Sequence, residues 1–343
     1  MPTADQSPAS LIGEMERFIR RDPARRGLIG SEDCLGPLCA GHLAAAAADL
    51  AANGSAVAIV TGFFVPGAVP PAAETDGPPG AVLLAAALER LGMRTAVFTD
   101  ELCLRAVRVA AEAASYAREQ MHALPGLSPD WTETLLAETF DGELTHLIAV
   151  ERVGPSHTDV SFRAQRRNAA VPWEHFASLV PPEARDRCHN MRGEAIDAHT
   201  PALHRLFDEL ARYRPAAKTI GIGDGGNEIG MGSIPWETIV ERLEGPHVAR
   251  IPCRIATDWT LLAGTSNWGA YALAAAVALL KGDTESLRPF DCEQQLRVIE
   301  RMVHDGPAVD GVTRRQEPTV DGLPFLTYIQ PWAGIRRLLG LPE

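Results

Sequence analysis

The positions of hydrophobic and polar residues alternate between two periods along most of the chain. Short apolar runs rich in β-branched residues predict strands buried on both faces, at residues 56–61, 94–99, 146–150, 218–222 and 248–257. Apolar residues spaced three and four apart predict helices, at residues 38–52, 81–91, 101–124, 201–213, 235–243, 268–281 and 291–304. This alternation predicts an α/β fold, with a mainly parallel sheet flanked by helices.

Two segments depart from the alternation. Residues 152–200 are irregular and richer in Arg, His and Pro, which is typical of an insertion or of a lid-like subdomain over the sheet. Residues 306–322 hold several Gly, Pro and Asp residues, so we expect a folded-back loop before the last helix. No linker composition divides the chain, and we expect residues 1–343 to form a single α/β domain.

Composition narrows the choice of partners. The 343 residues are 46% hydrophobic and carry a formal net charge of −12, which favours a soluble globular protein and excludes a nucleic-acid partner. The sequence shows no secretory signal and no apolar run long enough for a membrane span. Its six cysteines lack a Cys-x-x-Cys pair, which indicates reduced thiols. We therefore expect a cytoplasmic protein that binds a small molecule or a cation, with a homo-oligomer left open.

Acidic residues follow the predicted strands. Because ligands of open α/β sheets bind at the carboxyl ends of the strands, this edge should form a crevice lined with carboxylates. The residues concerned are Glu74, Asp76, Asp100, Glu151, Asp224, Glu228 and Asp258. Helix capping is the stronger interpretation for Asp100 and Asp258.

Carboxylates that converge in one crevice must be neutralised by protons, by Arg or by a metal. Oxygen ligands suit Mn²⁺ or Mg²⁺, and also Ca²⁺, better than zinc. The metal-ligand set that we predict is Glu74, Asp76, Asp224, Asn227 and Glu228. Whether Asp224 and Glu228 hold the metal or move protons stays open.

Residues 223–232, Gly-Asp-Gly-Gly-Asn-Glu-Ile-Gly-Met-Gly, combine five glycines with oxygen-bearing side chains, which favours a binding or catalytic loop over an ordinary turn. Gly221, Gly223 and Gly226 also match the dinucleotide fingerprint G-x-G-x-x-G. However, Asp224 and Glu228 lie where a pyrophosphate would bind, and helical sequence resumes only near Pro235. We therefore expect no nucleotide cofactor.

Two further loops precede helices and should offer free amides to a substrate carboxylate, at residues 77–80 and 264–267. One residue of Thr265, Ser266 and Asn267 should act as a simple N-cap. The sequence contains no G-x-S-x-G nucleophile motif. His157, His189 and His199 could supply a general base, although solvated or hydrogen-bonded histidines are more common.

Six segments together resemble the D-glutamate cyclase family, over a stretch from about residue 38 to the end. They are Thr61-Gly-Phe-Phe, Glu74-Thr-Asp-Gly-Pro-Pro-Gly-Ala, Glu151-Arg152, the glycine-rich loop 223–232, Ser266-Asn-Trp-Gly-Ala-Tyr-Ala-Leu and Val320-Asp-Gly-Leu-Pro. The resemblance implies a lyase that converts D-glutamate to 5-oxo-D-proline and water.

The chemistry of that reaction suggests roles for the residues. We predict Glu151 as the general base toward the amine, with Asp224 and Glu228 as the other catalytic carboxylates. The predicted substrate-binding residues are Thr61, Gly77, Gly80, Arg152, Gly225, Gly226, Thr265, Ser266 and Asn267. Two alternatives remain: a metal-dependent phosphatase or hydrolase acting on a small anionic metabolite, and a non-catalytic metabolite-binding protein.

Overall fold

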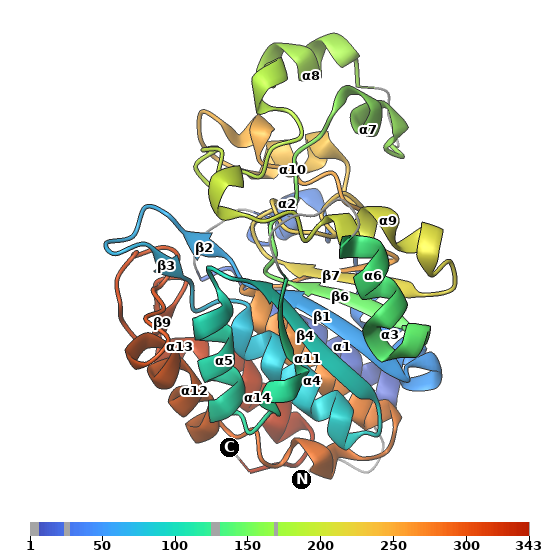
Figure 1. The fold of residues 1–343 in the computed structure, drawn as a ribbon, viewed down its shortest axis with the longest axis vertical. Helices are drawn as coiled ribbons and strands as arrows, with labels where there is room; N and C mark the ends of the chain where they lie inside the picture. Colours follow the sequence, from blue (N-terminus) through green and yellow to red (C-terminus); the bar gives the residue numbers. More distant parts are fainter. Residues whose placement is uncertain (1–6, 24–27, 125–130, 168–170, 343) are drawn as a thin grey trace.

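A six-stranded parallel sheet forms the centre of the computed structural model, which describes residues 7–23, 28–124, 131–167 and 171–342 (Figure 1). Its strands are β1 (Ala56–Thr61), β4 (Arg94–Asp100), β5 (Met121–Leu124), β6 (His146–Val150), β7 (Lys218–Gly223) and β8 (Trp259–Leu262). The order β5-β4-β1-β6-β7-β8 changes direction between β1 and β6. Such a topological switch point is where open α/β sheets bind ligands. The predicted α/β class is confirmed.

Helices cover both faces of the sheet, and two short antiparallel strand pairs lie outside it (Figure 1). The pairs are β2 (Phe64–Val65) with β3 (Ala72–Ala73), and β9 (Thr319–Val320) with β10 (Leu323–Pro324). The helices are α1 (Pro8–Ile19), α2 (Glu32–Leu35), α3 (His42–Asn53), α4 (Pro78–Arg90), α5 (Leu104–Ala113), α6 (Trp131–Glu138), α7 (Asp159–Ala164), α8 (Trp173–Leu179), α9 (Arg205–Tyr213), α10 (Trp236–Arg242), α11 (Ser266–Leu280), α12 (Cys292–His304), α13 (Phe325–Tyr328) and α14 (Gln330–Leu338).

Alternate side chains of the strands enter two separate cores. Val57 and Ile59 of β1 pack among residues of α1, α3, α4, α11 and α12 on one face. Ala58 and Val60 pack on the other face, among residues of α6, α9 and α10. This follows from the two-residue side-chain period of a strand, and it explains why the strands read as continuous apolar runs.

Helices α4 and α11 form the centre of the first core. Both are apolar around nearly their whole circumference, and in α11 only the last residues, Leu279 and Leu280, are not buried. The small alanine side chains of α11 allow it to pack against α4, α3 and α1 at once. In the described part of the chain, no helix has the length and apolar character needed to cross a membrane.

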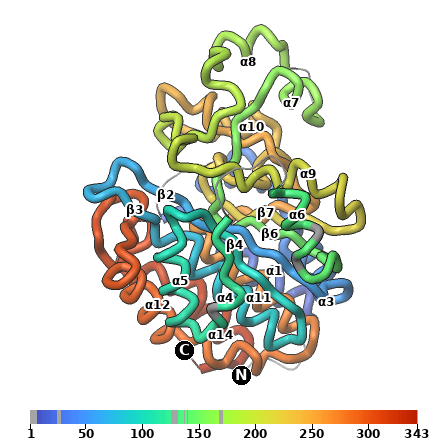
Figure 2. The backbone as a smooth tube through the Cα atoms, viewed as in Figure 1, coloured from blue at the N-terminus to red at the C-terminus, as the bar shows by residue number. Residues whose placement is uncertain are grey.

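The irregular segment 152–200 folds mainly over the sheet edge that carries the switch point (Figure 2); its residues 168–170 lie outside the described residues. Phe162, Phe176 and Val180 share a small aromatic core with Trp236 of α10. The bridge from Val153 to Glu228 joins the start of the segment to the glycine-rich loop. At the other end of the chain, Val309 pairs with Glu74, so the C-terminal loop reaches the same edge.

Two predicted elements are wrong. Residues 101–124 form α5 and then the edge strand β5 instead of one helix. Residues 248–257 contain a 3₁₀ turn at Val248–Arg250 and an extended stretch that pairs with loops, while β8 begins only at Trp259. Pro252 lies in this stretch and has no backbone N–H to donate to a neighbouring strand, which disfavours a strand inside the sheet. Asp258 therefore precedes β8 and accepts a hydrogen bond from the backbone N–H of Thr219 at the opposite edge of the sheet, so its expected place after a strand and its interpretation as a helix cap are both wrong.

Candidate active site

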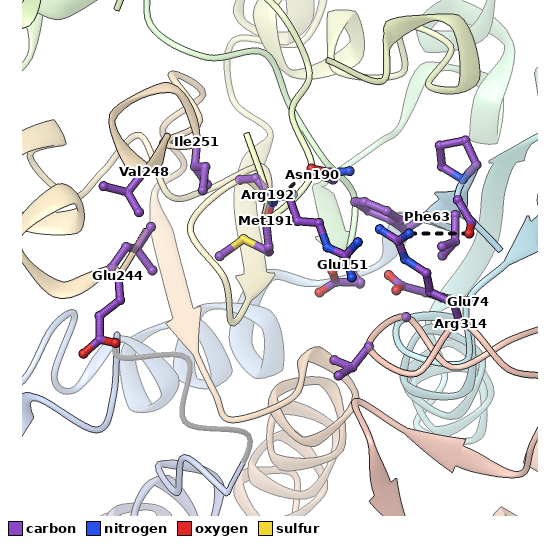
Figure 3. Close-up of a pocket in the computed structure, with 17 residues that line it drawn as sticks. Phe63, Glu74, Glu151, Asn190, Met191, Arg192, Glu244, Val248, Ile251 and Arg314 are labelled. Atoms are coloured by element: carbon purple, nitrogen blue, oxygen red, sulfur yellow. Dashed lines mark hydrogen bonds between the residues drawn. The ribbon is translucent and has the colours of Figure 1, made fainter. Parts of the chain in front are cut away.

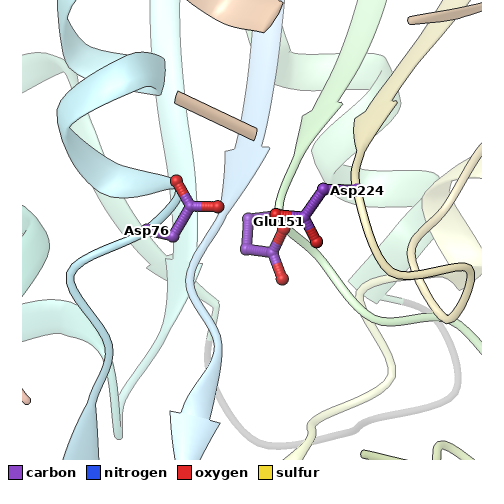
Figure 4. Close-up of side chains that lie close together, drawn as sticks. All are labelled: Asp76, Glu151 and Asp224. Carbon is purple, nitrogen blue, oxygen red and sulfur yellow. The ribbon is translucent and has the colours of Figure 1, made fainter. Parts of the chain in front are cut away.

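Three buried carboxylates meet beside the switch point. Asp76 lies just before α4, Glu151 directly follows β6, and Asp224 directly follows β7. One carboxylate oxygen from each lies within 4.8 Å of the other two. Figure 4 shows the three side chains approaching one another from neighbouring segments. These residues are up to 148 positions apart in the sequence (224 − 76). They meet at the carboxyl ends of the parallel strands, where open α/β sheets bind their ligands.

The backbone at Glu151 is held in an uncommon conformation. Its φ of 46° lies near the left-handed region, which non-glycine residues seldom occupy and which is often found at functional sites. Gly77 makes room for it, because a Cβ at Gly77 would lie 2.7 Å from Cβ of Glu151. The hydroxyl of Ser266 donates a hydrogen bond to Oε2 of Glu151 at 2.5 Å, which orients the carboxylate.

The two helix ends expected to offer free amides cap each other instead. Asp76 accepts hydrogen bonds from the backbone N–H groups of Ser266 (2.8 Å) and Asn267 (3.0 Å) at the start of α11. Asn267 in turn accepts through Oδ1 from Gly77 (3.1 Å) and Gly80 (2.7 Å) at the start of α4. These amides are occupied, so the expectation of free amides is corrected. Thr265 is the N-cap of α11, as predicted for one residue of the three.

Glu228 organises the glycine-rich loop from within. Its carboxylate accepts hydrogen bonds from the backbone N–H groups of Asp224 (3.2 Å), Gly225 (2.7 Å) and Gly226 (2.7 Å). The φ of 106° at Gly226 permits this tight turn. Glu228 therefore stabilises the loop that presents Asp224, and it uses the amides that a pyrophosphate would need.

Arg152 is buried and holds the surrounding loops together. Its guanidinium donates to the carbonyl oxygens of Gly62 and Pro201, both at 2.7 Å, and forms an ion pair with Asp100. Asp100 also accepts a hydrogen bond from the backbone N–H of Cys103 at 3.0 Å, in the turn before α5. The N-cap of α5 is Cys103, so the interpretation of Asp100 as a helix cap is wrong. These contacts favour a positioning role for Arg152 over direct contact with substrate.

A cavity of about 350 Å³ opens beside the carboxylate cluster (Figure 3). Glu151 lines this cavity and also belongs to the cluster, so the two features form one site. Glu74 and Glu244 supply two further carboxylates to the wall, and Asn227 supplies an amide whose Oδ1 makes no hydrogen bond to any described protein group. Apolar contacts come from side chains that include Phe63, Met191 and Ile251.

Two arginines of the cavity wall were not predicted from the sequence. Arg192 comes from the irregular segment 152–200, and Arg314 comes from the C-terminal loop. Neither segment shows a hydrophobic period, so the sequence offers no signal of where these side chains lie. Both positions depend on how the two segments fold over the sheet edge.

The hydroxyl of Thr61 and three predicted histidines lie outside the carboxylate cluster. Thr61 ends β1, and its buried hydroxyl makes no hydrogen bond to the described protein groups. Burial, together with Arg167 and Arg254, lowers the pKa of His157 to about 3, which leaves this ring neutral. Burial also lowers the pKa of His189, and the ring of His199 stacks on Phe64. None of these histidines lines the cavity.

The cluster of three carboxylates is suited to bind a hard cation, or to share protons among its members. Three carboxylate oxygens this close repel one another when all are charged, and their burial strengthens the repulsion. An oxygen-rich, buried cluster of this kind matches the ligand preference of Mg²⁺ or Mn²⁺. A ligand in the adjoining cavity would be in contact with it through Glu151.

Comparison with known proteins gives one consistent result. The family described as "D-glutamate cyclase-like, C-terminal" matches residues 15–181 and 180–331. The chain is 32% identical over 286 residues to the mitochondrial D-glutamate cyclase of Homo sapiens, which covers 81% of this chain and 40% of that protein. The chain thus spans less than half the length of this relative. On these matches, the chain belongs to the D-glutamate cyclase-like C-terminal family.

Proposed function

We propose that this chain is a lyase that converts D-glutamate to 5-oxo-D-proline and water. The observation that carries the proposal is the position of Glu151, which belongs both to a buried carboxylate cluster and to the wall of a small cavity. The name of the human relative, D-glutamate cyclase, supplies the substrate. Both reacting groups belong to one molecule, so binding it in a curled form supplies the proximity that the reaction needs.

The reaction requires two changes in the substrate. The ammonium group must lose a proton so that its nitrogen can bond to the carbon of the γ-carboxylate. One C–O bond of that carboxylate then breaks, and its oxygen leaves as water with the two protons that the nitrogen gives up. A positioned carboxylate can accept the first proton and return it to the leaving oxygen.

The cavity wall provides carboxylates for this proton transfer. Glu74 and Glu151 both line it, and Glu151 also contributes to the cluster with Asp76 and Asp224. Because Glu151 belongs to the cluster and Glu74 does not, we favour Glu74 as the group that accepts the ammonium proton and Glu151 as a ligand in the cluster. The sequence-based choice of Glu151 as the base stays the alternative.

We further propose that Asp76, Glu151 and Asp224 hold a divalent cation, Mn²⁺ or Mg²⁺. The fit rests on three buried carboxylate oxygens within 4.8 Å of one another and on the absence of nitrogen or sulfur from this set of described ligands. When bound, such an ion would act as a Lewis acid that makes the γ-carboxylate carbon more electrophilic. The hydroxyl of Ser266 holds the Glu151 carboxylate, and the first backbone N–H groups of α11 hold the Asp76 carboxylate.

The test is turnover of D-glutamate by the purified chain. We expect 5-oxo-D-proline to form in the presence of Mn²⁺ or Mg²⁺, to be suppressed by a chelator, and to form more slowly from L-glutamate; chiral chromatography would follow the product. Absence of product with every metal, together with phosphate release from a phosphomonoester panel, would contradict the proposal and favour the phosphatase. Binding of D-glutamate without any turnover would favour the metabolite-binding protein.

A further inference from the structure

Arg192 and Arg314 are the cationic side chains among the described residues that line the cavity. We infer that they bind the two carboxylates of the substrate and thereby select a dicarboxylate. This inference rests on the proposed function for the identity of the substrate, but it concerns the recognition of two negative charges. Figure 3 shows both guanidinium groups extending toward the part of the cavity where Glu74 and Glu151 lie.

The loop that carries Arg192 is held in a fixed shape. The side chain of Asn190 accepts hydrogen bonds from the backbone N–H groups of Arg192 (2.9 Å) and Glu194 (3.1 Å), and it donates to the Glu194 carboxylate at 2.7 Å. The bridge between His189 and Ala195 closes the loop at its base. The backbone is therefore ordered, while the exposed guanidinium makes no hydrogen bond or ion pair within the described residues. Its donors remain available for a ligand.

The loop that carries Arg314 is ordered in a similar way. Asp310 is fully buried and accepts hydrogen bonds from the backbone N–H groups of Val312 (2.9 Å) and Thr313 (2.7 Å). Arg314 itself has a φ of 60°, an uncommon conformation for a residue with a side chain. Its guanidinium has one weak hydrogen bond, to the carbonyl oxygen of Gly67 at 3.5 Å. Four of its five N–H donors are left for a ligand.

The charged side chains of the cavity wall favour a ligand that carries one ammonium group and two carboxylates. Glu74, Glu151 and Glu244 give the cavity wall negative charge, which suits an ammonium group but repels a carboxylate. Two arginines on the same wall reverse that repulsion locally, and each can bind a carboxylate through two parallel hydrogen bonds. One ammonium and two carboxylates are the charged groups of glutamate. A monocarboxylate would leave one guanidinium without its partner.

Calorimetric binding of glutarate and butyrate to the purified chain tests the inference without requiring turnover. We expect the wild-type chain to bind glutarate more tightly than butyrate. Arg192→Gln and Arg314→Gln should each weaken glutarate binding by about 10- to 100-fold, as expected for loss of a charge-assisted pair, with a smaller effect on butyrate. Arg192→Lys and Arg314→Lys should restore part of the loss. Arg297→Gln is the matched control, because Arg297 pairs with Glu293 on α12 outside the cavity.

The outcomes separate the inference from the proposed function. Glutarate binding that depends on both arginines, in a chain that forms no 5-oxoproline, would support the inference and contradict the cyclase. Turnover of D-glutamate with KM unchanged in Arg192→Gln and Arg314→Gln would overturn the inference and leave the cyclase standing. Failure of the wild-type chain to bind glutarate, or equal affinity for glutarate and butyrate, would also overturn it.

Discussion

Glu151 shows how a single residue joins the parts of the site. Its carboxylate belongs to the cluster with Asp76 and Asp224 and also faces the cavity. Its backbone has a φ of 46°, which costs free energy for any residue with a Cβ. The conformation persists because the neighbouring segments hold the residue there, and it places the carboxylate at the switch point of the sheet.

The cost of this conformation can be measured by comparing two substitutions. Glu151→Gly and Glu151→Ala both remove the carboxylate that accepts the hydrogen bond from Ser266. They differ in the Cβ, so the glycine variant should be more stable than the alanine variant by about 1 kcal/mol. Urea unfolding of the two variants gives this difference directly. An alanine variant as stable as the glycine variant would contradict the left-handed backbone at this position.

At the scale of elements, reciprocal capping joins the first turn of α4, which follows β3, to the first turn of α11, which follows β8. Asp76 caps α11, and Asn267 of α11 caps α4. A side chain just before α4 therefore satisfies N-terminal amides of α11, and a side chain of α11 satisfies N-terminal amides of α4. Because Asp76 belongs to the carboxylate cluster, the same contacts that join the helices position one of its three carboxylates.

Removal of the Asn267 side chain should therefore destabilise the fold. Asn267→Ala leaves the backbone N–H groups of Gly77 and Gly80 buried without their acceptor, and it leaves the carbonyl of Thr75 without its donor. We expect the free energy of unfolding to fall by about 2–4 kcal/mol. Asn53→Ala is the control, since Asn53 is exposed and its side chain bonds only Asp49 among the described residues; its effect should be within about 0.5 kcal/mol. Equal effects of the two substitutions would contradict the capping role.

Element prediction succeeded where burial on two faces left a clear pattern. The strands at β1, β4, β6 and β7 are continuous apolar runs because both cores receive their side chains. Strand β5 was missed because its four residues include an exposed histidine and follow a helix without a clear stop. The run at residues 248–257 was predicted as a strand, but it begins with a 3₁₀ turn and then bridges loops around Gly230 and Ser156 instead of joining the sheet.

At the scale of the whole molecule, the rule that ligands bind at strand ends pointed to all three carboxylates of the cluster but not to the cavity. Asp76, Glu151 and Asp224 are among the seven acidic residues expected from the sequence to line one crevice because they follow predicted strands; the order of the strands in the sheet came from the structure. Arg192 and Arg314 depend on two irregular segments that fold over the same edge from positions more than 100 residues apart in the chain (314 − 192 = 122). No local pattern encodes that packing. The roles of Glu228 and Arg152 also required the structure, because only their hydrogen-bond partners show that they hold loops together.

The most direct test of the account is the initial rate of D-glutamate cyclisation with saturating Mn²⁺, measured for the wild-type chain, Asp224→Asn and Asp258→Asn. Asp224 belongs to the cluster, whereas Asp258 bonds Thr219 at the opposite edge of the sheet. The account predicts a loss of about 100-fold or more for Asp224→Asn and a rate close to wild type for Asp258→Asn. A wild-type rate in the Asp224→Asn variant would contradict the assignment of the carboxylate cluster as the active site.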